Sequence, residues 1–220
     1  AVGDYAAARP LYERALAITE QALGPSHPST ATSLNNLAGL FRAVGDYAAA
    51  RPLYERAIAI YEQALGPSHP QTASSLNNLA GLLCVVGDYA AARPLYERAI
   101  AITEQALGPR HPSTATSLNN LAELFRAVGD YAAARPLYER AIAIREQALG
   151  PRHPATATSL NNLAITCYYQ GKIAVAADLM RRALAIFVQR LGADHPNTKS
   201  AQQSLEVIEE QMAENEGESR

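Results

Sequence analysis

The sequence predicts an all-α fold, a solenoid in which antiparallel helix pairs stack along one axis. Two recurring motifs and their spacing support this fold class. One unit returns every 42 residues, with Leu-Asn-Asn-Leu-Ala beginning at Leu34, Leu76, Leu118 and Leu160, and Gly-Asp-Tyr at Gly3, Gly45, Gly87 and Gly129. Such a period is typical of stacked helical arrays, where each unit buries its apolar face against its neighbours. Residues 1–42 and 85–126 differ at only four positions, so we expect nearly identical units.

The composition limits the classes of function. The chain has 220 residues, 48% of them hydrophobic, and a formal net charge of −2, which does not favour nucleic acid as a partner. No apolar run approaches the roughly 20 residues that cross a bilayer, and no export signal opens the sequence. We therefore predict a cytoplasmic protein without a nucleic-acid or membrane partner.

The first predicted element, residues 1–24, is a lone second helix (helix B) of a truncated repeat. Asp4 has the residue type that caps a helix, and Gly24-Pro25 ends it because proline cannot continue the hydrogen-bond ladder. No first helix precedes it in the sequence to cover its apolar face. We expect this end either to follow upstream sequence or to stack on another molecule.

The next predicted element is a first helix (helix A) from Pro28 to about Val44. Its apolar residues Leu34, Leu37, Ala38 and Phe41 are spaced as one face of an α-helix. Helix B of the next repeat continues this pattern with Tyr47, Ala50, Tyr54, Ala57 and Ile58. An interior proline should bend four of the B helices and set the curvature of the array; these prolines are Pro10, Pro52, Pro94 and Pro136.

The remaining elements follow from the same register. Residues 25–191 hold four complete 42-residue repeats, and residues 192–212 form a C-terminal capping helix. The capping helix carries Gln202, Gln203, Glu206 and Glu209 where earlier units carry apolar residues or asparagine, as expected of a solvated end. Residues 213–220 are predicted to be a disordered acidic tail.

The repeated residues resemble those of the tetratricopeptide repeat, whose usual period is shorter. The matching positions in one repeat are Leu34, Leu37, Ala38, Phe41, Gly45, Tyr47, Ala50, Tyr54 and Ala57. The 42-residue length, with Gly-Asp-Tyr, Arg-Ala-Ile-Ala-Ile and Leu-Gly-Pro-x-His-Pro, resembles the kinesin-light-chain subtype. This resemblance implies a right-handed superhelix whose concave groove, lined by A helices, takes an extended peptide. It also implies that the groove asparagines that hold peptide backbone are Asn35, Asn77, Asn119 and Asn161.

The few positions that differ between repeats indicate where specificity resides. Position 39 and its equivalents hold Gly39, Gly81, Glu123 and Ile165, and position 42 and its equivalents hold Arg42, Cys84, Arg126 and Tyr168. Both positions share one stripe of helix A with Asn35, at spacings of four and seven residues. The constant asparagine could bind peptide backbone, while Arg42, Glu123, Arg126 and Tyr168 select side chains.

An alternative interpretation of this stripe also fits the sequence. The first or second asparagine of each pair could bond a neighbouring helix, and the variation at positions 39 and 42 could be surface drift. We favour groove binding for the first asparagine of each pair, and the neighbouring-helix role for the second.

Other polar residues give no sign of chemistry. A histidine recurs once in each unit, too far apart to converge on one metal ion, and more simply caps the next helix; these are His27, His69, His111, His153 and His195. No phosphate-binding glycine loop or nucleophile motif occurs. We therefore predict no enzyme activity, no cofactor and no metal site.

Two functions remain for such a chain. The favoured one is a protein-interaction scaffold, part of a larger protein, that binds an extended peptide or partner segment in its concave groove. The alternative is a structural spacer or self-assembling repeat module without a specific peptide ligand, associating end to end through the uncapped N-terminal helix.

Overall fold

The computed structural model describes residues 5–218, with side chains described through Asn215. Within these residues the regular structure is helical throughout, without strands. The chain divides into two compact units, residues 1–109 and residues 110–220, which are described separately below. The predicted cap Asp4 and the residues before it lie outside the described part.

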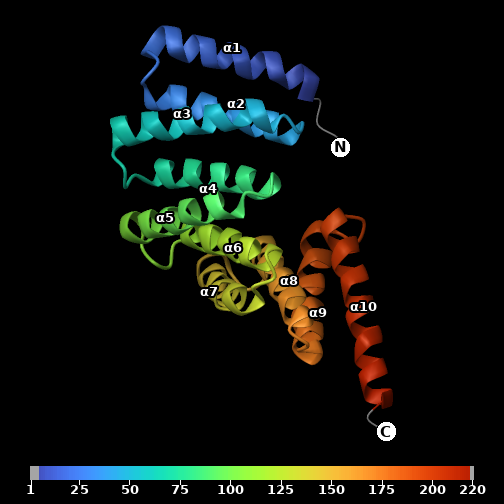
Figure 1. The fold of residues 1–220 in the computed structure, drawn as a ribbon. Coiled ribbons are helices and arrows are strands. Elements are labelled where there is room, and N and C mark those ends of the chain that lie inside the picture. Colours follow the sequence, from blue (N-terminus) through green and yellow to red (C-terminus); the bar gives the residue numbers. More distant parts are fainter. Residues whose placement is uncertain (1–4, 219–220) are drawn as a thin grey trace. The chain divides into compact units, whose positions relative to one another are not determined.

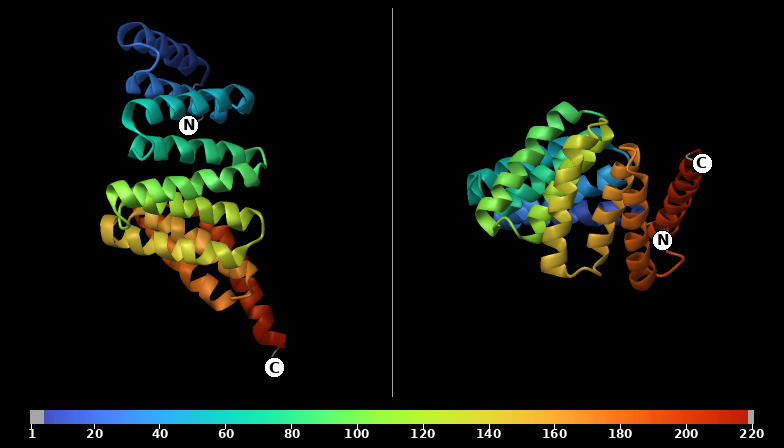
Figure 2. Two further views of the ribbon diagram at one scale, coloured as in Figure 1. Left: turned by 60° about the vertical axis from the view of Figure 1, so that its left-hand side comes forward. Right: turned by 90° about the horizontal axis from the view of Figure 1, so that it is seen from below.

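The first unit holds three B helices and two A helices. Figure 1 shows them as a stack in chain order, and Figure 2 shows the same order from other sides. They are α1 (Tyr5–Leu23), α2 (Pro28–Ala43), α3 (Tyr47–Leu65), α4 (Pro70–Val85) and α5 (Tyr89–Leu107). Each helix packs against the next one in the chain, and the A helices α2 and α4 also contact each other.

The second unit follows the same plan and ends on an A helix. Its elements are α6 (Pro112–Ala127), α7 (Tyr131–Leu149), α8 (Pro154–Tyr169), α9 (Ile173–Leu191) and α10 (Pro196–Glu218). Consecutive helices pack together, and the A helix α8 contacts both other A helices, α6 and α10. The A helices of each unit therefore lie next to one another.

The helix ends are fixed by the residue types that the sequence analysis singled out. Asp46 caps α3, since its Oδ1 accepts a hydrogen bond from the Ala49 backbone N–H at 3.1 Å, and Asp88 and Asp130 do the same for α5 and α7. Gly66 ends α3 with a φ of 96°, a backbone conformation that other residues adopt rarely. The predicted helix A, from Pro28 to about Val44, agrees to within about one residue with α2.

The histidines are helix caps, as predicted. The Nδ1 of His27 accepts a hydrogen bond from the Ser29 backbone N–H at 3.1 Å, and the other four repeat this bond at their own helices. Among the described residues no group of histidine, cysteine and acidic side chains has an arrangement that could hold a metal ion. The same part of the chain contains no helix long and apolar enough to cross a membrane.

The core is formed by the predicted apolar stripe. Leu34, Leu37, Ala38 and Phe41 of α2 are buried, and so are Ala50, Tyr54, Ala57 and Ile58 of α3. The interior prolines lie inside α1, α3, α5 and α7 as expected. Their predicted role in setting the curvature of the whole array, like its right-handed sense, stays a prediction.

The C-terminal helix corrects one expectation. Residues 213–220 were expected to be disordered, but α10 continues to Glu218, beyond the predicted end at Met212. Glutamine, methionine, alanine and glutamate have high helix propensity, and Gln211 donates hydrogen bonds to Glu214 and Asn215 one turn ahead. Low hydrophobicity therefore did not end this helix. Residues 219 and 220 lie outside the described part.

Candidate functional site

The variable stripe of the first unit borders an open hollow of about 500 Å³. Its floor comes from α2 through Asn35, Asn36, Gly39 and Arg42, and Asn78 of α4 joins them. Tyrosine side chains from the B helices complete it, namely Tyr5, Tyr12 and Tyr54. This first-unit hollow is therefore lined mainly by amide, phenol and guanidinium groups, which can bond polar groups of a ligand.

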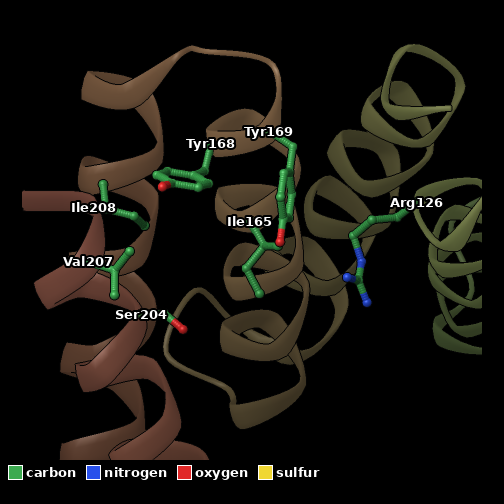
Figure 3. A pocket seen from close by; sticks show the side chains of 7 residues that line it. All are labelled: Arg126, Ile165, Tyr168, Tyr169, Ser204, Val207 and Ile208. Carbon is green, nitrogen blue, oxygen red and sulfur yellow. The ribbon is translucent and has the colours of Figure 1, made fainter. Parts of the chain in front are cut away.

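The equivalent stripe of the second unit borders a hollow of about 330 Å³ with a different lining. Figure 3 shows Ile165 and Tyr168 on α8 facing Val207 and Ile208 on α10, with Arg126 reaching toward the space from α6. In this second-unit hollow, positions 39 and 42 supply Ile165 and Tyr168 from α8, and α10 supplies Val207 at its own equivalent of position 39. The second-unit hollow therefore has an apolar surface with the positive charge of Arg126 beside it.

The aromatic wall of the second-unit hollow is held in place by further ring contacts. Tyr169 stacks on Tyr131 of α7, with ring centroids 5.2 Å apart, and meets Tyr168 edge to face at 5.6 Å. The side-chain amide of Gln170 donates to the Tyr131 carbonyl oxygen at 3.0 Å. Tyr168 is thus half-buried, and its ring packs against a fixed neighbour.

The first asparagine of each pair is largely engaged in bonds within the protein. The Asn35 amide donates to the Ser75 hydroxyl of the next A helix at 2.6 Å, and Asn119 accepts from the Ser159 hydroxyl at 2.9 Å. Asn119 is only 5% exposed. These contacts match the alternative interpretation, in which the asparagine links neighbouring helices. Asn77 bonds the Ala73 carbonyl of its own helix, and Asn161 contacts Asn162 at 3.4 Å.

The second asparagine is the more accessible one in the first unit. Asn36 and Asn78 are both exposed, and both line the first-unit hollow. The sequence analysis favoured the first asparagine, because its spacing to positions 39 and 42 is one and two helical turns. One residue rotates a side chain by about 100° around the helix, and the approach of the next A helix covers the first asparagine instead.

Glycine at position 39 leaves room for side chains from neighbouring helices. A Cβ on Gly81 would lie 3.1 Å from Nη1 of Arg42, which therefore extends over the next A helix. Tyr54 is buried below, and this burial raises the pKa of its phenol, while the nearby Arg42 guanidinium acts in the opposite direction. Arg42 is exposed and free to meet a ligand.

Glu123 and Asn162 change this arrangement in the second unit. The Asn162 amide donates to Oε1 of Glu123 at 3.1 Å, so the carboxylate of the predicted site residue is partly occupied by a protein partner. Below it the Tyr138 hydroxyl is buried, and burial, assisted by the Glu123 charge, raises the pKa of Tyr138 strongly. Arg126 has no carboxylate within ion-pair distance in the described residues, so its charge is available to the hollow.

A buried arginine was missed by the sequence analysis. Arg145 stands where other repeats carry Thr19, Tyr61 and Thr103, and it is 8% exposed. Its Nη1 donates to the Ser159 hydroxyl at 2.6 Å and to the Ala155 carbonyl at 2.9 Å. Burial lowers the pKa of Arg145, and the Glu123 charge opposes that shift. The departure from the repeat consensus was the signal that could have identified it.

The arrangement of the helices and of the variable positions defines a class of protein. Stacked A and B helices with a constant core and a varied surface stripe make a helical-repeat scaffold. The chain belongs to the tetratricopeptide repeat family, whose model matches residues 1–63, 35–84, 71–147 and 124–189. Repeats of this family generally act as protein-interaction scaffolds.

Solved structures place the chain near kinesin light chain-like repeats. It is similar to a kinesin light chain-type protein with nearly identical TPR-like repeats from Podosopora anserina, at 28% identity, covering 87% of this chain and 90% of that one, with a TM-score of 0.73. A variant of that protein matches with a TM-score of 0.74 at the same identity and coverage. BtubC (BKLC) from P. vanneervenii shares the fold at 22% identity, with a TM-score of 0.70 over 95% of this chain and 91% of its own. No curated protein matches the sequence.

Proposed function

We propose that the chain binds an extended peptide or partner segment along the exposed face of its A helices. One observation carries this proposal: positions 39 and 42, which differ between otherwise near-identical repeats, line a hollow in each unit. Gly39 and Arg42 border the first-unit hollow, and Arg126, Ile165 and Tyr168 border the second. Variable side chains that share one concave surface are typical of a ligand site.

The contacts of the described residues refine which side chains take part. Arg42, Arg126 and Tyr168 are assigned to the partner's side chains, and the exposed Asn36 and Asn78 to its backbone. Asn35 and Asn119 are assigned to bonds between A helices. Asn77 and Asn161 stay predicted backbone contacts, and Glu123 stays a predicted contact that must first release Asn162.

The affinity expected of such a surface is modest. A neutral hydrogen bond contributes about 0.5–1.5 kcal/mol and one to a charged group about 1.5–3 kcal/mol. A few such bonds, with some burial of Tyr168 and Ile165, give a dissociation constant of micromolar order after the cost of ordering the peptide.

A screen of displayed peptides against the whole chain tests this proposal. For a selected peptide, we expect Arg126→Ala or Asn78→Ala to weaken binding by about tenfold without changing the thermal midpoint. Arg51→Ala is the matched control, because Arg51 pairs with Glu55 at 2.8 Å on an exposed part of α3 away from both hollows. Equal binding by all three variants would refute the site.

A second candidate, end-to-end self-association, rests on the exposed face of α1. Tyr12 is 38% exposed where its equivalent Tyr54 is 2% exposed, and Ile18 is 53% exposed where Ile60 is 6% exposed. In α3 this face is covered by α2. Under this candidate, a second copy of the chain covers the α1 face.

Light scattering across a concentration series separates this candidate from the scaffold function. If self-association occurs through α1, the mass should rise with concentration and return to that of a monomer when a helix A sequence is added before Ala1. A monomer at every concentration would rule the candidate out.

A further inference from the structure

A third hollow, outside the variable stripe, lies where the turn between α7 and α8 meets the end of α9 in the second unit. It encloses about 340 Å³. Leu149, Pro151 and Pro154 give it apolar walls, and its polar groups come from Arg152, His153 and Arg190. We call it the turn hollow.

The polar groups of the turn hollow are hydrogen-bond donors. The Nδ1 of His153 accepts a bond from the Ala155 backbone N–H at 3.1 Å, so the neutral ring carries its proton on Nε2 and donates there. The Nε of Arg190 donates to the Arg152 carbonyl oxygen at 3.1 Å, which fixes one guanidinium beside the turn and leaves its Nη groups available.

The two arginines of the turn hollow lack a counter-charge. In the described part of the chain neither guanidinium has a carboxylate within ion-pair distance, whereas Arg135, Arg181 and Arg182 of the same unit each have one. Two cations that line one hollow without an acidic neighbour repel each other, unless an anion lies between them. The hollow therefore has the charge and the donors of an anion site.

The internal repeats show that this chemistry comes from two substitutions. The equivalent turn of the first unit has the same walls and the same histidine, in Leu65, Pro67, His69 and Pro70. It carries Ser68 in place of Arg152 and Ala106 in place of Arg190. The His69 cap is the same as that of His153, at 3.2 Å to the Gln71 backbone N–H. The residues of the turn are thus common, and the pair of Arg152 and Arg190 distinguishes this turn from that of the first unit, where Arg98 donates to the Pro67 carbonyl oxygen instead.

We propose that the turn hollow binds a phosphate monoester group. Two planar guanidinium groups and one ring N–H can bond several oxygens of a doubly charged phosphate, and arginine recognises phosphate oxygens in pairs. The apolar walls suit the carbon atoms that carry the phosphate. This site is independent of the peptide site on the variable stripe, and it would add a charge-dependent contact to whatever partner the chain binds.

Titration of the whole chain with inorganic phosphate and with O-phosphoserine, followed by calorimetry and by the arginine Nε–H resonances in NMR spectra, tests the proposal. We expect one saturable site with a millimolar dissociation constant, and displacement of the Arg152 and Arg190 resonances. Binding of both probes assigns the site to phosphate monoesters. Binding of inorganic phosphate alone would overturn the monoester assignment, and saturation by neither would overturn the site.

Variants copied from the other repeats give matched controls. Arg152→Ser and Arg190→Ala, which install the residues of the first unit, should each weaken binding by about tenfold. Lys172→Ala removes an exposed cation elsewhere in the unit and should have no effect. If all three variants bind alike, the phosphate is attracted only by the general surface charge, and the proposal fails.

A gain-of-function variant provides the complementary test. Ser68→Arg combined with Ala106→Arg builds the same residues into the first unit, where the walls and the histidine are already present. The stoichiometry should rise from one bound phosphoserine to two. A stoichiometry that stays at one, with circular dichroism unchanged, would show that the two arginines do not suffice and would contradict the proposed chemistry.

Discussion

The hollows on the A helices of the two units differ in chemistry although the same repeat builds both. The first is lined by asparagine, tyrosine and Arg42, and the second by Ile165, Tyr168 and the apolar residues of α10, with Arg126 beside them. Beneath both, the leucine and alanine core is the same from repeat to repeat. The comparison teaches that two surface positions can reset the character of a binding face while the packing that supports it stays constant.

The layer just beneath the surface differs as well. In the first unit the Asn35 amide donates to the Ser75 hydroxyl at 2.6 Å. In the second unit the Ser159 hydroxyl both donates to Asn119 and accepts from the buried Arg145. Glycine at position 39 is replaced by Glu123, whose carboxylate holds Asn162. The surface of the second unit is thus backed by a connected polar network of Asn119, Ser159 and Arg145.

The largest expected effect tests whether equivalent core residues of the two units contribute equally to the free energy of unfolding. Leu37 and Leu163 are equivalent residues, 4% and 5% exposed. Truncation of either to alanine should lower the free energy of unfolding by about 2–5 kcal/mol, through the cavity that it leaves. Urea unfolding measures both, and costs that differ by more than about 2 kcal/mol would contradict the idea of a common core.

The serines that link the A helices should separate the two units. Ser159→Ala leaves the Arg145 guanidinium short of a partner in a buried place and should cost about 3 kcal/mol. Ser75→Ala removes one neutral bond and should cost about 1 kcal/mol. Chemical denaturation of the two variants provides the comparison. If Ser75→Ala lowered the free energy of unfolding more than Ser159→Ala, the polar network would not add stability to the second unit.

Alkaline pH should reveal the difference between Tyr138 and Tyr54. Burial raises the pKa of both phenols above their unfolded value of about 10. At Tyr138 Glu123 adds to this shift and Arg126 opposes it, and at Tyr54 Arg42 opposes it. Each phenol therefore contributes stability that is complete below about pH 10 and is lost as the pH rises further, by up to about 1.4 kcal/mol per pH unit.

Phenylalanine substitutions isolate these contributions. Tyr138→Phe should remove more of the stability loss between about pH 9 and pH 11 than Tyr54→Phe does, as measured by urea unfolding at each pH. The same loss in both variants and the parent chain would show that neither phenol controls the alkaline transition.

The smallest expected effect concerns the glycine of the first-unit stripe. A Cβ on Gly39 would lie 3.6 Å from the Tyr54 hydroxyl, an ordinary contact, so Gly39→Ala should stabilise α2 by about 0.5–1 kcal/mol. Thermal unfolding should show a slightly higher midpoint. A lower midpoint would mean that the stripe is packed more tightly than the distance indicates.

The sequence predicted the fold well because its signals are local and repeated. The spacing of Leu34, Leu37 and Phe41 defined the buried face, and Asp46 and His27 marked the helix starts that the structure has. Sequence also identified positions 39 and 42, which line the hollows. These inferences needed only helical periodicity and capping chemistry.

The features that the sequence did not predict depend on contacts between helices. Which asparagine of a pair is exposed is decided by where the next A helix lies, and one residue along the helix changes the answer. Arg145 is buried because Ser159 and the Ala155 carbonyl, on the following helix, accept its hydrogen bonds. The length of α10 was underestimated because low hydrophobicity was given more weight than helix propensity.

The central claim is that positions 39 and 42 of the A helices choose the partner. The most direct measurement is calorimetric titration of a peptide selected on the second unit, against the parent chain and a variant with Ile165→Glu and Tyr168→Arg. These substitutions give α8 the residue types that α6 carries in Glu123 and Arg126. The account predicts a loss of affinity of tenfold or more with an unchanged helix content. Unchanged affinity would show that the variable stripe does not select the ligand.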